Sequence, residues 1–173
     1  MKGQGMSRRT TIQIRNQYLK FSAAHFTIFS ATDRERLHGH NFAVRANVTA
    51  LVGDDGLCFD YNVMKKKLRA LCDGLDEYLL LPNHSPHLEV SCSDDGASIV
   101  ATFNDEQMTF LASDTQVLPL SNITAEELSY FLLGKLIDGD VAEQYKISEV
   151  ELFVGSGEGQ SASTRWHVTE GFL

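Results

Sequence analysis

The feature that most constrains the fold is an alternation of apolar and polar residues along positions 42–52. The apolar residues of one parity are Phe42, Val44, Ala46, Val48, Ala50 and Val52. The polar residues between them are Arg45, Asn47 and Thr49. Successive side chains of a strand point to opposite faces, so this segment predicts a half-buried strand that ends at the turn 53–56. The fold must therefore cover one face of a sheet.

Three further segments predict strands. Residues 11–29 are rich in Ile, Tyr, Phe and Thr and predict a long first strand. Segments 146–154 and 163–169 predict two closing strands, separated by the glycine-rich loop 155–159. The main sheet is therefore expected to have four strands.

Two helices and a hairpin are predicted between these strands. Apolar residues recurring at spacings of three and four from Val63 or Met64 predict a first helix, and the capping-box pair Thr124 and Glu127 begins a second. A β-hairpin is expected as an insertion at about 88–118. The order β-β-α-α-β-β predicts an α+β fold in which two helices cover one face of a four-stranded antiparallel sheet.

Composition limits the possible classes of protein. A chain of 173 residues with 43% apolar residues fits one domain, expected at 11–173 behind a flexible N-terminus at 1–10. A net charge of -8 gives no reason to bind nucleic acid, and no apolar stretch predicts a membrane span. The scattered cysteines Cys58, Cys72 and Cys92 predict neither a disulfide framework nor a thiolate zinc site. We expect a cytoplasmic protein.

A histidine pattern suggests a metal site. His38 and His40 are two residues apart at the start of the predicted second strand, so both rings point to the same face. His25 joins them if the first two strands form a hairpin. Three histidines without a fourth protein ligand are typical of a catalytic zinc. The alternative is that these are ordinary strand histidines bonded to the backbone.

Several segments resemble the 6-pyruvoyl-tetrahydropterin synthase and 6-carboxy-tetrahydropterin synthase family. They are FSAAH at 21–25, LHGHNF at 37–42, FDY at 59–61, PLSNITAE at 119–126 and QSA at 160–162. The resemblance implies the tunnelling fold and Zn²⁺ bound by His25, His38 and His40. It also implies a pterin-like small molecule bound at a subunit interface, in a homo-oligomer that is usually a hexamer.

The residues expected to perform the chemistry differ from the family pattern. Members of the family carry a cysteine base four residues before the HGH motif, where this chain has Arg34, which cannot accept a proton but could hold a phosphate or carboxylate. The adjacent Glu35 resembles a subgroup that uses glutamate to cleave the side chain of dihydroneopterin. Glu35 could instead be a charged loop residue. The family's Asp-His pair reads Asp76-Glu77, and either carboxylate could serve as a base or be a helix-end charge.

The residues that anchor the ligand are also altered. The family holds the pterin with a glutamate at the end of its penultimate strand, and this chain has no carboxylate at Gly155 or Ser156. Glu158 is the nearest substitute, or else an exposed loop residue. We take Arg34, Thr124 and Glu158 as the predicted substrate-binding residues.

These observations leave three functions open. The first is a zinc lyase acting on dihydroneopterin or its triphosphate, with Glu35, Asp76 or Glu77 as the base. It would belong to a pterin, folate or deazapurine pathway. The second is a non-catalytic or altered-substrate zinc-binding relative, and the third a zinc hydrolase.

Overall fold

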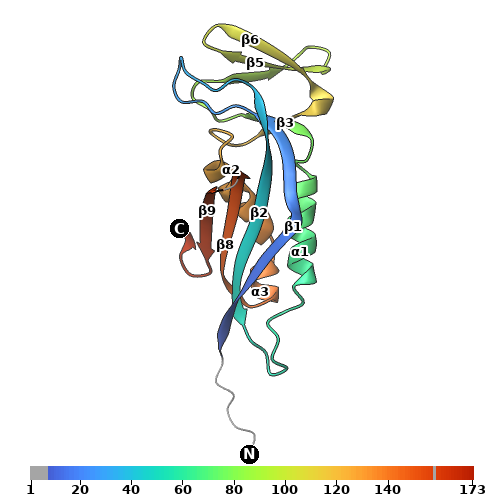
Figure 1. The fold of residues 1–173 in the computed structure, drawn as a ribbon, viewed down its shortest axis with the longest axis vertical. Coiled ribbons are helices and arrows are strands. Elements are labelled where there is room, and N and C mark those ends of the chain that lie inside the picture. Colours follow the sequence, from blue (N-terminus) through green and yellow to red (C-terminus); the bar gives the residue numbers. More distant parts are fainter. Residues whose placement is uncertain (1–7, 158) are drawn as a thin grey trace, which may run out of the picture.

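The computed structural model describes residues 8–157 and 159–173 and contains a main sheet, covering helices and a second, small sheet (Figure 1). The long strands are β1 (Arg9–His25), β2 (His38–Leu51), β8 (Ile147–Gly157) and β9 (Gln160–His167). They lie in the order β9-β8-β2-β1, and every neighbouring pair is antiparallel. These are the four strands predicted from the sequence. Of the segment predicted to be flexible, residues 1–7 lie outside the described residues, and β1 begins at Arg9.

Three short strands extend the main sheet to seven. They are β3 (Tyr78–Pro82), β7 (Thr115–Leu118) and β10 (Gly171–Phe172). β3 pairs in parallel with the end of β1 and with β7. The sheet therefore has more strands than the four predicted. Periodicity could not reveal β3 because its side chains from Leu79 onward are all buried, and a short apolar run also fits a helix end.

The helices α1 (Asn62–Asp73) and α2 (Ala125–Ile137) cover one face of the main sheet (Figure 1). Their apolar residues share one core cluster with the alternating residues of β2, as predicted. Thr124 caps α2, since its hydroxyl accepts a hydrogen bond from the amide of Glu127 at 3.3 Å. A short helix, α3 (Val141–Gln144), precedes β8. No helix in the described part of the chain is long and apolar enough to span a membrane.

The inserted segment forms a separate three-stranded sheet of β4 (Glu89–Cys92), β5 (Ser98–Phe103) and β6 (Glu106–Leu111). The predicted hairpin is β5 and β6, and β4 adds a third strand. Asn104 and Asp105 turn the hairpin with φ of 47° and 65°, values that two-residue hairpin loops require. A second core cluster lies beneath this sheet. Its buried members are Phe26, Ile28, Leu79, Leu81, Leu88, Ala101 and Phe103.

Candidate metal centre and active site

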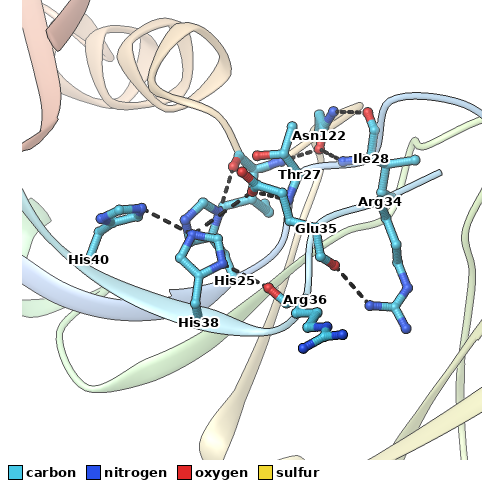
Figure 2. Close-up of polar contacts among 10 residues, drawn as sticks. His25, Thr27, Ile28, Arg34, Glu35, Arg36, His38, His40 and Asn122 are labelled. Atoms are coloured by element: carbon cyan, nitrogen blue, oxygen red, sulfur yellow. Dashed lines mark hydrogen bonds and ion pairs between the residues drawn. The ribbon is translucent and has the colours of Figure 1, made fainter.

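Three histidine side chains converge where β1 ends and β2 begins (Figure 2). His25 ends β1 and pairs with His38, the first residue of β2. His40 follows two residues later, so its ring lies on the same face as that of His38. One ring nitrogen of each histidine lies within 4.8 Å of the others, and Nε2 of His38 is 3.0 Å from Nε2 of His40. Strand register thus brings together the three histidines predicted as metal ligands.

Backbone carbonyl groups orient two of these rings. Nδ1 of His25 donates to the carbonyl of Ile123 at 2.9 Å, and Nδ1 of His38 donates to the carbonyl of Arg36 at 2.8 Å. Because a carbonyl only accepts, Nδ1 carries the proton, and in the neutral imidazole Nε2 then has a free lone pair. Nε2 of His25 is buried and has no hydrogen-bond partner among the described residues. Such an acceptor costs about 1 to 3 kcal/mol, which a bound cation would offset, so the rings fit a zinc site.

The environment of His25 favours its neutral form. Burial lowers the pKa of His25, the hydrogen bond to Ile123 opposes that shift, and the nearby His38 and His40 lower the pKa further. The net shift is downward. Neutral imidazole is the form that coordinates a metal ion, so the packing that buries His25 favours the form that a metal site requires.

Glu35 lies beside the histidines on the loop between β1 and β2. Its Oε2 accepts a hydrogen bond from the amide of Thr27 at 2.9 Å and lies 3.9 Å from Nε2 of His38. Burial raises the pKa of Glu35, but hydrogen bonds from Thr27 and the neighbouring histidines lower it by more, so the net shift is downward. The carboxylate is therefore ionised near neutral pH and can accept a proton.

Asn122 ties this loop to the segment before α2. Its Oδ1 accepts a hydrogen bond from the amide of Ile28 at 3.1 Å, and its Nδ2 donates to the Ile28 carbonyl at 2.8 Å. The following residue, Ile123, supplies the carbonyl that orients His25. Asn122 was not among the predicted site residues. It belongs to the matched segment 119–126, but only the folded chain shows that its partner is Ile28.

Part of this site borders a cleft of about 570 Å³. This volume is typical of small-molecule sites, which span roughly 300 to 1,000 Å³. His25, Glu35 and His40 lie along it, together with the N-terminus of α2 and the β8–β9 turn. The lining residues from those two elements include Thr124, Glu126, Ser156, Gln160 and Ser161. The cleft thus combines imidazoles, carboxylates and hydroxyls.

Comparison with known proteins identifies the architecture. The family model for 6-pyruvoyl tetrahydropterin synthase matches residues 14–165. The chain belongs to the 6-pyruvoyl tetrahydropterin synthase family. The matched range includes the three histidines and Glu35, and it confirms the resemblance found in the sequence.

Individual relatives agree with this assignment. A candidate 6-carboxy-5,6,7,8-tetrahydropterin synthase of Methanocaldococcus jannaschii is 26% identical over 149 residues, covering 85% of this chain and 90% of that protein. The 6-pyruvoyl tetrahydropterin synthase of Plasmodium falciparum is 26% identical, with a TM-score of 0.86 over 92% of this chain and 99% of that one. The Plasmodium vivax enzyme shares the fold at 24% identity, with a TM-score of 0.87 over 93% and 99%. A further P. vivax structure carries alanine in place of a catalytic glutamate.

The family's Asp-His position lies apart from the cleft. Oδ1 of Asp76 accepts a hydrogen bond from the amide of Ser22 at 2.6 Å. Glu77 has a φ of 65° and donates its amide to the Ser22 carbonyl at 2.7 Å. Glu77 borders a second hollow of about 440 Å³, which it shares with His40. The structure of the single chain therefore does not bring Asp76 and Glu77 to the cleft beside Glu35.

The predicted ligand-binding residues do not all lie in the cleft. Thr124 lines the cleft, whereas Arg34 is directed away from the histidine rings (Figure 2). Glu158 lies outside the described residues. Sequence reasoning missed Glu126, which lines the cleft from the first turn of α2. Its position two residues after the helix cap Thr124, within the matched segment 119–126, was the available signal.

Proposed function

We propose that this member of the 6-pyruvoyl tetrahydropterin synthase family is a zinc-dependent lyase acting on the side chain of dihydroneopterin or its triphosphate. The observation that carries the proposal is the convergence of three histidine rings beside the Glu35 carboxylate, with His25, His40 and Glu35 lining one cleft. Family membership supports a tetrahydropterin synthase-like enzyme. The reaction would serve a pterin, folate or deazapurine pathway.

His25, His38 and His40 would hold the zinc through their Nε2 atoms, since the Nδ1 atoms of His25 and His38 are committed to backbone carbonyls. A bound zinc ion would supply Lewis-acid chemistry that polarises oxygen atoms of the substrate side chain. The remaining chemistry falls to residues of the chain.

Glu35 is the proposed base. It takes the proton of a side-chain hydroxyl, the neighbouring carbon–carbon bond breaks and an aldehyde leaves. The carbon that remains on the ring recovers the proton, giving 6-hydroxymethyl-dihydropterin. The catalytic glutamate of the P. vivax relative supports a carboxylate in this role. Arg34 cannot act as a base because a guanidinium keeps its proton at working pH.

Glu126, Thr124 and Ser156 are the proposed contacts of the pterin ring. The ring presents amino and amide N–H groups, and an unpaired donor would cost about 1 to 3 kcal/mol. Glu126 is a carboxylate acceptor that lines the cleft, and Thr124 and Ser156 add hydroxyl groups. Glu158 is retained as an alternative acceptor.

A second candidate is an altered-substrate or non-catalytic zinc-binding relative. The hydrogen bond that Asp76 accepts from the Ser22 amide favours it, because this carboxylate is held against β1 and does not line the cleft. If turnover occurs without Glu35, Asp76 or Glu77 becomes the proposed base. We further propose a cytoplasmic homo-oligomer, a hexamer, that binds neither nucleic acid nor membranes.

The test incubates zinc-loaded protein with dihydroneopterin and, separately, its triphosphate, and identifies products by mass. We expect 6-hydroxymethyl-dihydropterin and little pyruvoyl- or carboxy-tetrahydropterin. Glu35→Gln should lower turnover by about 10²- to 10⁴-fold while zinc content is kept. Abundant carboxy-tetrahydropterin would contradict the proposal, and unchanged turnover in Glu35→Gln would exclude Glu35 as the base. Light scattering on the same sample reports the oligomer.

A further inference from the structure

Arg34 connects the site loop to the inserted sheet. Its guanidinium carbon lies 5.1 Å from the ring centroid of Phe26 and 5.5 Å from that of Phe103. Phe26 immediately follows β1, Phe103 ends β5, and both rings are buried in the second core cluster. Figure 2 shows the side chain of Arg34 directed away from the three histidine rings. The cation is therefore held by aromatic rings.

Few polar contacts hold the same guanidinium. Nη1 donates to the carbonyl of Glu35 at 2.9 Å, and Nη2 lies 3.6 Å from Oε2 of Glu106 in β6. The Glu106 side chain is 72% exposed, so solvent weakens this ion pair. Nε of Arg34 is buried without a partner among the described residues. The two aromatic rings and the Glu35 carbonyl are therefore the main restraints on the Arg34 guanidinium.

The contacts of Arg34 restrain the neighbouring residue, Glu35, whose carboxylate faces the histidines. Glu35 donates its amide to the Thr27 carbonyl at 2.8 Å, and its Oε2 accepts from the Thr27 amide at 2.9 Å. Thr27 follows Phe26 in sequence, just as Glu35 follows Arg34. The contact between Phe26 and Arg34 thus links the two halves of the loop immediately beside the Thr27–Glu35 pair.

We propose that Arg34 is a positioning residue for Glu35, and that the inserted sheet of β4, β5 and β6 supports the loop that carries this base. The inference rests on the proposed function, in which Glu35 accepts the proton. It assigns Arg34 a role different from the phosphate or carboxylate binding expected from the sequence. A guanidinium packed against Phe26 and Phe103 does not line the cleft.

The test compares Arg34→Met, which keeps apolar volume between the rings, with Arg34→Lys, which keeps a cation there. Arg34→Met should lower kcat by about 10- to 100-fold with little change in KM, because a displaced base slows chemistry more than binding. Arg34→Lys should recover part of that loss. Lys135→Met is the matched control, since Lys135 lies 5.8 Å from the Phe131 ring on α2 and has no link to the loop. It should behave like the unmodified protein.

Two substrates separate positioning from ligand binding. Arg34→Met should reduce turnover of dihydroneopterin and of its triphosphate by the same factor. A rise in KM confined to the triphosphate would show that Arg34 binds phosphate and would overturn the inference.

Hydrogen exchange tests the structural part even if the unmodified protein turns over neither pterin. The Glu35 amide should exchange at least about tenfold faster in Arg34→Met, while amides in the centre of β2 keep their rates. Unchanged exchange at Glu35 would overturn the inference independently of the proposed function. If Arg34→Met does not fold, Phe103→Leu removes one ring from the stack and should give the same exchange pattern with a smaller change. Unchanged exchange in that variant would overturn the inference too.

Discussion

The two core clusters serve the candidate site in different ways. The larger cluster, between the main sheet and the helices, fixes the β1–β2 register that sets His25 opposite His38. The smaller cluster, beneath the inserted sheet, packs the rings of Phe26 and Phe103 against the Arg34 side chain next to Glu35. Strand register alone can gather three histidine rings, whereas a carboxylate on a loop is held in place by contacts from elsewhere in the fold.

The largest expected effect is on the proposed metal site of the main sheet. His38→Ala should abolish stoichiometric zinc binding, because it removes one of three converging donors, and should lower zinc affinity by more than about 100-fold. Atomic absorption and competition with a chelating dye measure this. His84→Ala, an exposed histidine outside the cluster, is the control and should keep one zinc per subunit. Full zinc content in His38→Ala would show that the ligands lie elsewhere.

Core substitutions should show whether the two clusters unfold independently. Leu132→Ala, in the larger cluster, should lower the global free energy of unfolding by about 2 to 5 kcal/mol, because it leaves a cavity between α2 and the sheet. Leu88→Ala, in the smaller cluster, should accelerate hydrogen exchange in β4, β5 and β6 while amides of β2 stay protected. Denaturant unfolding and hydrogen exchange measure these effects. If Leu88→Ala accelerates exchange equally throughout, the two clusters are one cooperative unit.

Asn122→Ala should have an intermediate effect at the junction of the two regions. It removes two hydrogen bonds to Ile28 and should cost about 1 to 3 kcal/mol of unfolding free energy. Zinc affinity should fall only modestly, since the Ile123 carbonyl remains beside His25. Thermal unfolding and zinc titration check both values, with Ser113→Ala, which loses an exposed hydrogen bond to Asp114, as the control. A stability equal to that of the control would show that Asn122 does not tie the loop.

The smallest expected effect is a difference in the rates at which two cysteines of the folded protein are chemically labelled. Burial raises the pKa of the Cys72 thiol in α1 to about 12, so at pH 8 only about one thiol in 10⁴ is ionised. A rise of one pH unit increases that fraction about tenfold and still leaves it below roughly one in 100. Cys92 in β4 is exposed and should react with iodoacetamide first, as mass spectrometry can follow. Equal labelling rates would mean that the larger cluster opens as readily as the inserted sheet.

The sequence by itself determined the features that depend on short-range periodicity. The alternation along 42–52 placed one strand face in the core, and the H-x-H spacing put His38 and His40 on one face. The capping-box spacing located the start of α2 at Thr124. Each of these patterns is set by the repeat of a strand or a helix, which extends over a few residues and is visible in a single sequence.

Only the tertiary structure decided the contacts that join distant segments. Asn122 meets Ile28 across 94 positions, and Arg34 meets Phe103 through an inserted sheet whose third strand was not predicted. The orientation of Arg34, away from the cleft and between two aromatic rings, has no local signature. It depends on which side of the loop the inserted sheet packs against, and long-range packing of that kind leaves no periodic trace in the residues it brings together.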